Sequence, residues 1–319
     1  MSNQLEKGKW LGAIIVIASF IYVFYRLLQY GEDLSVPEIT ESAYNSLPIL
    51  AIAQLFLLCL NIFFETKKWQ WLLRSLLTLQ FRQSINMVLA GFASGIFTPA
   101  KIGEPVGRIM HLSKKWWAKA TVLNYIGGII QNIIIFVIGA LCFAFSWEHF
   151  SINLSLRSGM YILFLGVIVS VMFVVTLKRQ WLKQALKRFF YQKRIKRPVE
   201  ELLSMTISNL TLIFGYSFLR YLIYNFQLLL LLWYLGYSIT LESLLMIPVY
   251  FMLITVAPSF FIADLGVRGS VALFVFSDFG LSDVYIVLIV TTLWLLNQAV
   301  PALVGCTLIL FGKEVKVKY

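Results

Sequence analysis

Long uninterrupted apolar runs dominate the chain. Six of them are long enough to form membrane-spanning helices, namely residues 10–28, 46–64, 119–146, 159–177, 205–236 and 284–311. A helix of roughly 20 residues crosses a hydrocarbon core that is about 30 Å thick. The pattern therefore predicts an all-α integral membrane protein, with about six spanning helices in one polytopic domain over residues 1–319.

Two further stretches, 83–112 and 244–277, do not fit as single crossings. Basic segments flank the apolar part of the first on both sides, and acidic segments flank the second, which is also interrupted near Pro258. A helical hairpin that enters and leaves on one side satisfies each charge pattern, provided that protein covers its non-helical tip. We expect two re-entrant hairpins that enter from opposite sides, as in an inverted repeat.

Two basic segments have the pattern of helices that lie on the inner membrane surface. In 178–197, Trp181 and Phe189 fall on an apolar face while Lys183 and Lys187 fall on the opposite one, and residues 65–82 are similar but less regular. Amphipathic helices of this kind lie in the interface and are attracted to anionic lipid. We expect both segments to serve as anchors.

Composition and charge give the orientation. Of the 319 residues, 60% are hydrophobic and 13% are charged, and the formal net charge is +12. Lys and Arg gather in alternate loops, which the positive-inside rule assigns to the cytoplasm. The sequence thus predicts a multi-pass protein of the cytoplasmic membrane with both termini cytoplasmic. Because the basic residues lie in the loops that membrane topology explains, no nucleic-acid partner is expected. The three cysteines lie in apolar runs, which indicate neither a disulfide nor a metal site.

A polar motif occurs twice within the apolar sequence. Each copy is a proline, an acid and, four residues after the acid, an arginine: Pro99, Glu104 and Arg108, then Pro258, Asp264 and Arg268. At this spacing acid and arginine share a helical face and can pair. The prolines, with Gly103 and Gly266, are expected at the hairpin tips because proline disfavours helix at the preceding residue. Each acid then lies near a helix start, where the dipole favours a carboxylate or a ligand phosphate.

The motif has two interpretations. In one, each pair is a salt bridge that only allows a polar hairpin to exist in lipid. In the other, Arg108 and Arg268, with Lys101, hold an anionic headgroup, while the acids compete for the arginines or carry protons. Ionisable groups inside a membrane cost about 3 kcal/mol even on lenient scales, which favours a functional role.

Other intramembrane polar residues carry weaker signals. Arg220 lies in the middle of a long span and is the next candidate for phosphate contact. The asparagines and glutamines of the spans are more typical of hydrogen bonds between helices. Four glycines are expected to permit close helix packing: Gly91, Gly95, Gly127 and Gly128.

Three segments resemble a known family. The run at 97–108, the segment at 65–69 and the run at 265–270 are similar to the lysylphosphatidylglycerol synthase transmembrane family, which includes the flippase domain of multiple peptide resistance factor proteins. The resemblance implies lipid translocation rather than lipid synthesis. In bifunctional members a soluble aminoacyl transferase domain follows the membrane region, whereas this sequence ends at Tyr319, so no aminoacyl transfer is expected. Asp264 stands where the second motif is expected to carry Glu.

The leading hypothesis is a flippase for an anionic phospholipid or polyprenyl phosphate, without cofactor or metal. One alternative is a membrane enzyme that acts on lipid phosphate. Such catalysis usually needs His, Cys or clustered carboxylates in mutual reach, and the two histidines, His111 and His149, are predicted on opposite sides of the membrane, which argues against it. Another is a non-transporting accessory protein of an envelope pathway. The sequence does not identify the lipid, and it is compatible with a homo-oligomer and with a partner from an envelope pathway.

Overall fold

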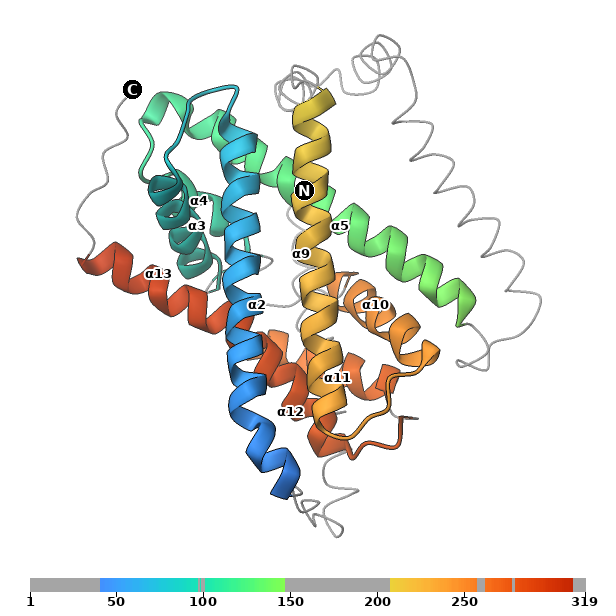
Figure 1. The fold of residues 1–319 in the computed structure, drawn as a ribbon. Coiled ribbons are helices and arrows are strands. Elements are labelled where there is room, and N and C mark those ends of the chain that lie inside the picture. The colour runs from blue at the N-terminus through green and yellow to red at the C-terminus, as the bar shows by residue number, and fades with distance from the viewer. Residues whose placement is uncertain are drawn as a thin grey trace, which may run out of the picture.

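The computed structural model describes residues 41–96, 98, 101–146, 207–256, 262–276 and 279–311. Its regular elements are α2 (Glu41–Leu73), α3 (Phe81–Ile96), α4 (Glu104–Ile109), α5 (Lys114–Phe145), α9 (Ile207–Tyr234), α10 (Leu241–Val256), α11 (Ile262–Phe276), α12 (Asp283–Trp294), the π-helix η5 (Leu295–Ala299) and α13 (Val300–Phe311) (Figure 1). Within these ranges every element is helical, so the all-α class is confirmed there. The expected spans at 10–28 and 159–177 and the surface helix at 178–197 lie outside the described residues.

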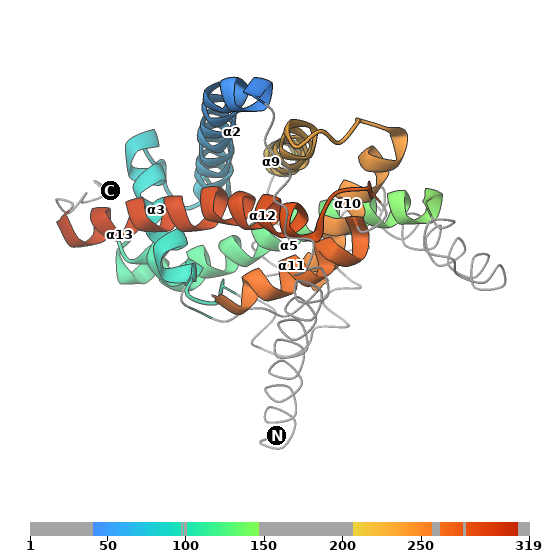
Figure 2. The same ribbon diagram turned by 90° about the horizontal axis from the view of Figure 1, so that it is seen from below.

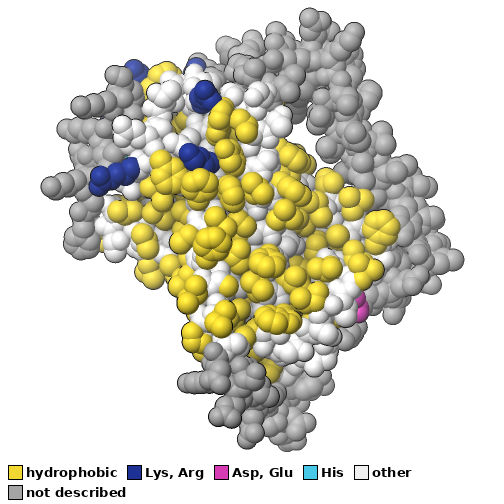
Figure 3. All heavy atoms as spheres, viewed as in Figure 1, with side chains coloured by type: hydrophobic (Ala, Val, Ile, Leu, Met, Phe, Trp, Pro, Cys, Tyr) yellow, Lys and Arg dark blue, Asp and Glu magenta, His cyan; other side chains and the backbone are white. Residues whose placement is uncertain are grey.

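Three of the described helical segments are long and apolar enough to cross a membrane, namely Ser46–Leu73, Lys114–Phe145 and Asp283–Leu310. Helix α9 also has 28 residues, and it includes Arg220 and three amide side chains, Asn209, Asn225 and Gln227. In Figure 3 apolar side chains cover the face on which α2 and α9 lie, and Lys and Arg appear at the end where α2 finishes. A lipid-facing surface has this distribution.

The sequence predicted a separate helix on the membrane surface at 65–82, but residues 65–73 continue α2. They are the last turns of α2 and bury Trp69, Leu72 and Leu73 completely or nearly so. A turn follows α2, and α3 then begins at Phe81. The apolar face that the sequence suggested for lipid therefore packs inside the protein, against α3 and α5 in a cluster that includes Met87 and Leu123.

The described chain has the same element order twice: a long helix, a helical hairpin and a second long helix. The first set is α2, α3–α4 and α5, and the second is α9, α10–α11 and α12–η5–α13. Helices α2 and α9 lie side by side and antiparallel (Figures 1 and 2). Near their crossing Gln54 and Gln227 each donate a side-chain N–H to the backbone carbonyl of the other, at 3.0 and 3.5 Å. An approximate two-fold axis between the halves would produce such reciprocal bonds.

The halves also exchange helix contacts. The last helix of the first half, α5, packs on α10 of the second, and the last helix of the second half, α13, packs on α3 of the first. Both contacts depend on a glycine. A Cβ at Gly139 would lie 2.7 Å from the carbonyl oxygen of Pro248, and a Cβ at Gly305 would lie 2.0 Å from that of Leu89. The hairpins are thus each held by a helix from the other half.

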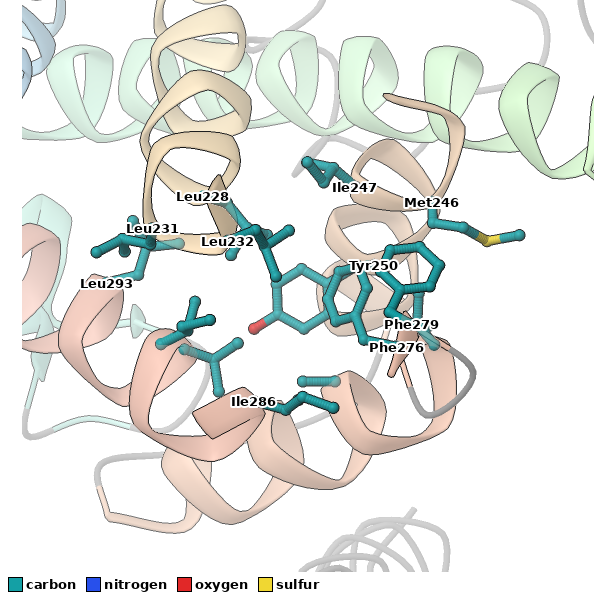
Figure 4. Close-up of a cluster of buried hydrophobic side chains, with 14 of the residues drawn as sticks. Leu228, Leu231, Leu232, Met246, Ile247, Tyr250, Phe276, Phe279, Ile286 and Leu293 are labelled. Atoms are coloured by element: carbon teal, nitrogen blue, oxygen red, sulfur yellow. The ribbon is translucent and has the colours of Figure 1, made fainter. Parts of the chain in front are cut away.

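Each half also has its own hydrophobic cluster. The second half packs Tyr250 and Phe276 together with leucines of α9 and Ile286 of α12, and the two rings lie 5.6 Å apart (Figure 4). The first half packs around Trp69 and Leu123. Ile213 of α9 also belongs to the cluster around Trp69, so α9 contacts both clusters.

Candidate functional site

One cavity of about 640 Å³ is lined by residues from both halves. Its lining includes both acid–arginine pairs predicted from the sequence, Glu104 with Arg108 and Asp264 with Arg268. Further charged residues come from α2, from α9 and from the segment before α4: Glu65, Lys68, Arg220 and Lys101. The structure therefore brings together two motifs that lie 160 residues apart in the sequence.

The first motif is positioned by close packing of α4 on α3. Gly107 lies against the carbonyl of Ala90, where a Cβ would come within 2.1 Å of the oxygen. Ser94 accepts the backbone N–H of Gly107 at 3.1 Å and lies 2.8 Å from the carbonyl oxygen of Gly103. Gly91 leaves space for Arg108, since a Cβ there would lie 2.6 Å from the arginine Cγ. These contacts turn the α4 arginine inward.

Glu65 is the centre of the charged cluster. Its carboxylate accepts from Arg108 Nη2 at 2.6 Å, from Lys68 Nζ at 2.7 Å and from Arg220 Nη1. Arg220 also donates from Nε to Asn61 at 2.8 Å. Because these cations come from α2, α4 and α9, one buried carboxylate joins three elements. A buried charge is tolerated when it is paired and hydrogen-bonded in this way.

The two acid–arginine pairs both form, but their surroundings differ. Glu104 Oε1 accepts from Arg108 Nη2 at 2.5 Å, and its side chain is 25% exposed. Asp264 Oδ2 accepts from Arg268 Nε and from Trp294 Nε1, each at 2.8 Å. The Trp69 ring packs against the arginine of the first pair. Its centroid lies 5.3 Å from Arg108 Cζ, which is within the range of a cation–π interaction.

Lys101 projects from the segment between α3 and α4. Its backbone has a φ of 56°, which is uncommon for a residue other than glycine. Its Nζ donates to Gln298 Oε1 at 2.7 Å, so it connects the hairpin to the π-helix η5. The neighbouring residue of η5, Asn297, points to the other side and donates to Gln227 at 3.0 Å. π-Helical turns are frequent at functional sites, and this one links the cavity to the α2–α9 crossing.

The described lining has an excess of positive charge. It contains five cationic side chains and three carboxylates, which leaves two positive charges over if all are ionised. Apolar and aromatic side chains form much of the remaining wall, including Phe92, Tyr125, Phe251 and Ile254. A cavity with these properties suits a molecule with an anionic part and an apolar part.

The family model described as lysylphosphatidylglycerol synthase TM region matches residues 10–305. The chain belongs to this family. The match includes α2 to α12 and both acid–arginine motifs, so the family segment contains the whole cavity. Comparisons with curated proteins and with solved structures give no match.

The family segments that suggested the resemblance meet at this cavity. Glu65 and Lys68, from the segment at 65–69, contact the arginine of the run at 97–108 directly or through the shared carboxylate. Arg220, predicted as the next candidate, joins the same cluster. The membrane class is supported by family membership and by the long apolar helices.

Three residues that line or support the cavity were missed by the sequence reasoning. The predicted span ended at residue 64, just before Glu65, and so this residue was not recognised as a buried acid. Trp294 binds Asp264 from 30 residues away, and Trp69 was assigned to a lipid surface. An acid followed by a lysine three residues later, near the end of a long apolar run, was the available signal for Glu65.

The predicted tip residues have mixed outcomes. Gly103 directly precedes α4 and donates its N–H to Thr98 Oγ1 at 2.8 Å, so it does lie in the connection of the first hairpin. Gly266 differs from the expectation, because α11 begins at Ile262 and Gly266 is buried inside that helix. Pro99 and Pro258 lie outside the described residues.

Of the four glycines that were predicted to permit close helix packing, three do so in the structure. Gly91, Gly95 and Gly127 each face a neighbouring side chain at contact distance. Among the described residues, a Cβ at Gly128 would meet no atom within 4 Å, and this residue lines the cavity instead. Gly128 therefore has no close-packing role against the part of the chain that the structure describes.

Proposed function

We propose that the protein is a flippase that moves an anionic phospholipid or a polyprenyl-phosphate lipid across the cytoplasmic membrane. The observation that carries this proposal is the cavity that both motifs line, with its excess of positive charge beside aromatic and aliphatic walls. Guanidinium groups match phosphate oxygens in geometry, so Arg108, Arg220 and Arg268 would hold the headgroup, with Lys101 as a fourth cation. Membership of a membrane family associated with lipid flipping supports it.

Alternating access is the proposed mechanism. The repeated element order, the antiparallel α2–α9 pair and the exchanged helix contacts support two inverted repeats around a central site. In this proposal the α3–α4 and α10–α11 hairpins enter from opposite membrane faces, six helices cross the membrane, and both termini are cytoplasmic. The headgroup passes between the hairpins while the acyl chains remain in lipid. We assign no covalent chemistry and no cofactor to the cavity.

A flipping assay tests the proposal. Purified protein is placed in liposomes with a fluorescent phosphatidylglycerol, and a membrane-impermeant reductant bleaches the outer leaflet. The wild-type protein is expected to make the inner-leaflet pool accessible. The double variant Arg108→Ala with Arg268→Ala is expected to reduce the rate by at least about tenfold, since each substitution removes a charge-assisted phosphate contact.

The control uses the same chemical change outside the cavity. Arg74 and Arg82 are both exposed, and neither lines the cavity. The variant Arg74→Ala with Arg82→Ala should flip lipid at the wild-type rate. If the cavity variant is unstable, Arg108→Lys with Arg268→Lys keeps the charge but loses the planar fork, and an intermediate rate is expected. Wild-type flipping by folded Arg108→Ala with Arg268→Ala would show that the assigned site is wrong.

A further inference from the structure

Two carboxylates share one arginine nitrogen, whose two N–H groups can serve one each. Glu65 Oε1 and Glu104 Oε1 lie 2.6 and 2.5 Å from Arg108 Nη2. The Glu65 side chain is 3% exposed and also binds Lys68 and Arg220. The Glu104 side chain is 25% exposed, lines the cavity, and among the described residues forms its ion pair with Arg108 alone. The two acids therefore differ in how much each would lose by leaving the arginine.

Displacing Glu65 would leave three buried cations without their common carboxylate. Losing one partner of a buried ion pair is strongly destabilising because the remaining charge is uncompensated. Displacing Glu104 would cost much less, because this side chain can turn into the cavity and be hydrated there. Arg108 also has a donor in reserve, since its buried Nε has no hydrogen-bond partner within the described part of the chain.

We infer that Glu104 is an exchangeable carboxylate: it occupies the anion-binding position on Arg108 until a singly charged phosphate diester replaces it. Glu65 holds the arginine in place throughout. This inference rests on the proposed function, and it identifies Glu104 as the side chain that competes with the lipid phosphate for Arg108. Arg108, Arg220 and Lys68 with Glu65 and Glu104 leave one positive charge over. A singly charged headgroup neutralises that excess.

The second motif does not have this property. Asp264 Oδ2 accepts two donors, Arg268 Nε and Trp294 Nε1, and the side chain is only 13% exposed. An anion that displaced Asp264 would leave a buried indole N–H without its acceptor, which is costly. The repeated motif therefore contains one exchangeable acid and one fixed acid, and the exchange site belongs to the α3–α4 hairpin.

Binding of a short-chain lipid tests this inference without any transport step. The full-length protein is placed in phosphatidylcholine nanodiscs and titrated by calorimetry with dihexanoyl phosphatidylglycerol, and with dihexanoyl phosphatidylcholine as the net-neutral control. Glu104→Gln keeps the side-chain size and removes the competing charge, so it should tighten phosphatidylglycerol binding about tenfold and leave phosphatidylcholine unchanged. The matched variant Asp264→Asn should not tighten binding.

Unchanged or weaker phosphatidylglycerol binding by Glu104→Gln, or an equal gain in Asp264→Asn, would overturn the exchange. Glu104→Ala serves as a second variant if the glutamine side chain itself caps Arg108, and it should give the same gain. Tighter binding by Glu104→Gln, together with no flipping by the wild-type protein, would support the exchange and contradict the flippase function. Flipping by the wild-type protein without tighter binding by Glu104→Gln would support the flippase function and contradict the exchange. An equal gain in the affinity for inorganic phosphate would support the exchange and assign the binding position to free phosphate instead of lipid.

Discussion

At the scale of single residues, Glu65 carries the largest structural role in the cavity. It is almost fully buried and accepts from Lys68, Arg108 and Arg220. Glu65→Gln removes the charge while keeping the size, and it should lower the stability of the folded protein by about 3–5 kcal/mol because buried cations lose their counter-charge. Thermal unfolding in detergent, followed by size-exclusion chromatography with fluorescence detection, measures the loss.

Glu104→Gln is the matched control for this prediction. It removes one carboxylate from the same arginine, but the Glu104 side chain is partly exposed. Its unfolding temperature should fall much less than that of Glu65→Gln. Equal losses in the two variants would contradict the assignment of Glu65 as the fixed partner.

The Trp294 to Asp264 hydrogen bond is a second prediction at this scale. The indole N–H lies 2.8 Å from Asp264 Oδ2 inside a membrane domain, where double-mutant cycles on single side-chain hydrogen bonds give about 0.6 kcal/mol on average and up to about 1.7 kcal/mol. Trp294→Phe keeps the ring and removes the donor. A double-mutant cycle of Trp294→Phe with Asp264→Ala, measured by unfolding in sodium dodecyl sulfate, should give a coupling energy in that range. A cycle of Trp294→Phe with Glu104→Ala should show no coupling, because no bond joins those residues.

At the scale of helices, two glycines set the distance between the halves. Gly139 brings α5 against α10, and Gly305 brings α13 against α3. In each case a Cβ would collide with a backbone carbonyl oxygen, which cannot rotate away as a side chain can. Gly139→Ala and Gly305→Ala should each lower stability by about 1–3 kcal/mol, as overpacking does. The unfolding temperature in detergent measures this loss.

Gly128→Ala and Gly215→Ala provide the comparison. Both lie inside helices, and a Cβ at either would meet no atom within 4 Å among residues 41–96, 98, 101–146, 207–256, 262–276 and 279–311. Alanine is favoured over glycine in a helix by about 1 kcal/mol, so these variants should keep or raise the unfolding temperature. A fall as large as that of Gly305→Ala would mean that the loss does not come from the α3–α13 contact.

How much the sequence predicted differs between elements for physical reasons. Apolar length predicted α2, α5 and the α12–α13 segment, and the spacing of four predicted both acid–arginine pairs. Hydropathy could not predict that α2 continues to Leu73, because a basic, tryptophan-rich segment is also typical of a membrane surface. What settled its position is packing with α3 and α5, a contact that depends on residues far away in sequence.

The same limit applies to the cavity. The local motif contains Glu104 and Arg108, but Glu65 and Arg220 reach them only because α2 and α9 cross. The π-helix η5 was not predicted either, although Pro301 after it marks a place where the regular hydrogen-bond ladder is interrupted. Single-sequence patterns indicate which residues are polar in lipid, and helix packing determines which of them meet.

At the scale of the whole molecule, the antiparallel α2–α9 pair makes a prediction about sidedness. Along α2 from Gln54 to Asn61, the partners on α9 run backwards from Gln227 to Arg220. The segments that follow the two helices therefore lie at opposite ends of the molecule. Exposed Ser75 follows α2, near Arg74 and Arg82, whereas exposed Ser238 follows α9, near Glu242.

Cysteine labelling in intact cells tests this arrangement. In a background with Cys59, Cys142 and Cys306 replaced by alanine, Ser238→Cys should react with a membrane-impermeant maleimide from outside. Ser75→Cys should react only after permeabilisation, because the positive-inside rule assigns its basic surroundings to the cytoplasm. The reversed result would invert the orientation but keep the crossing. Labelling of both sites from outside would contradict the antiparallel pair itself, and with it the inverted repeats on which the proposed alternating access depends.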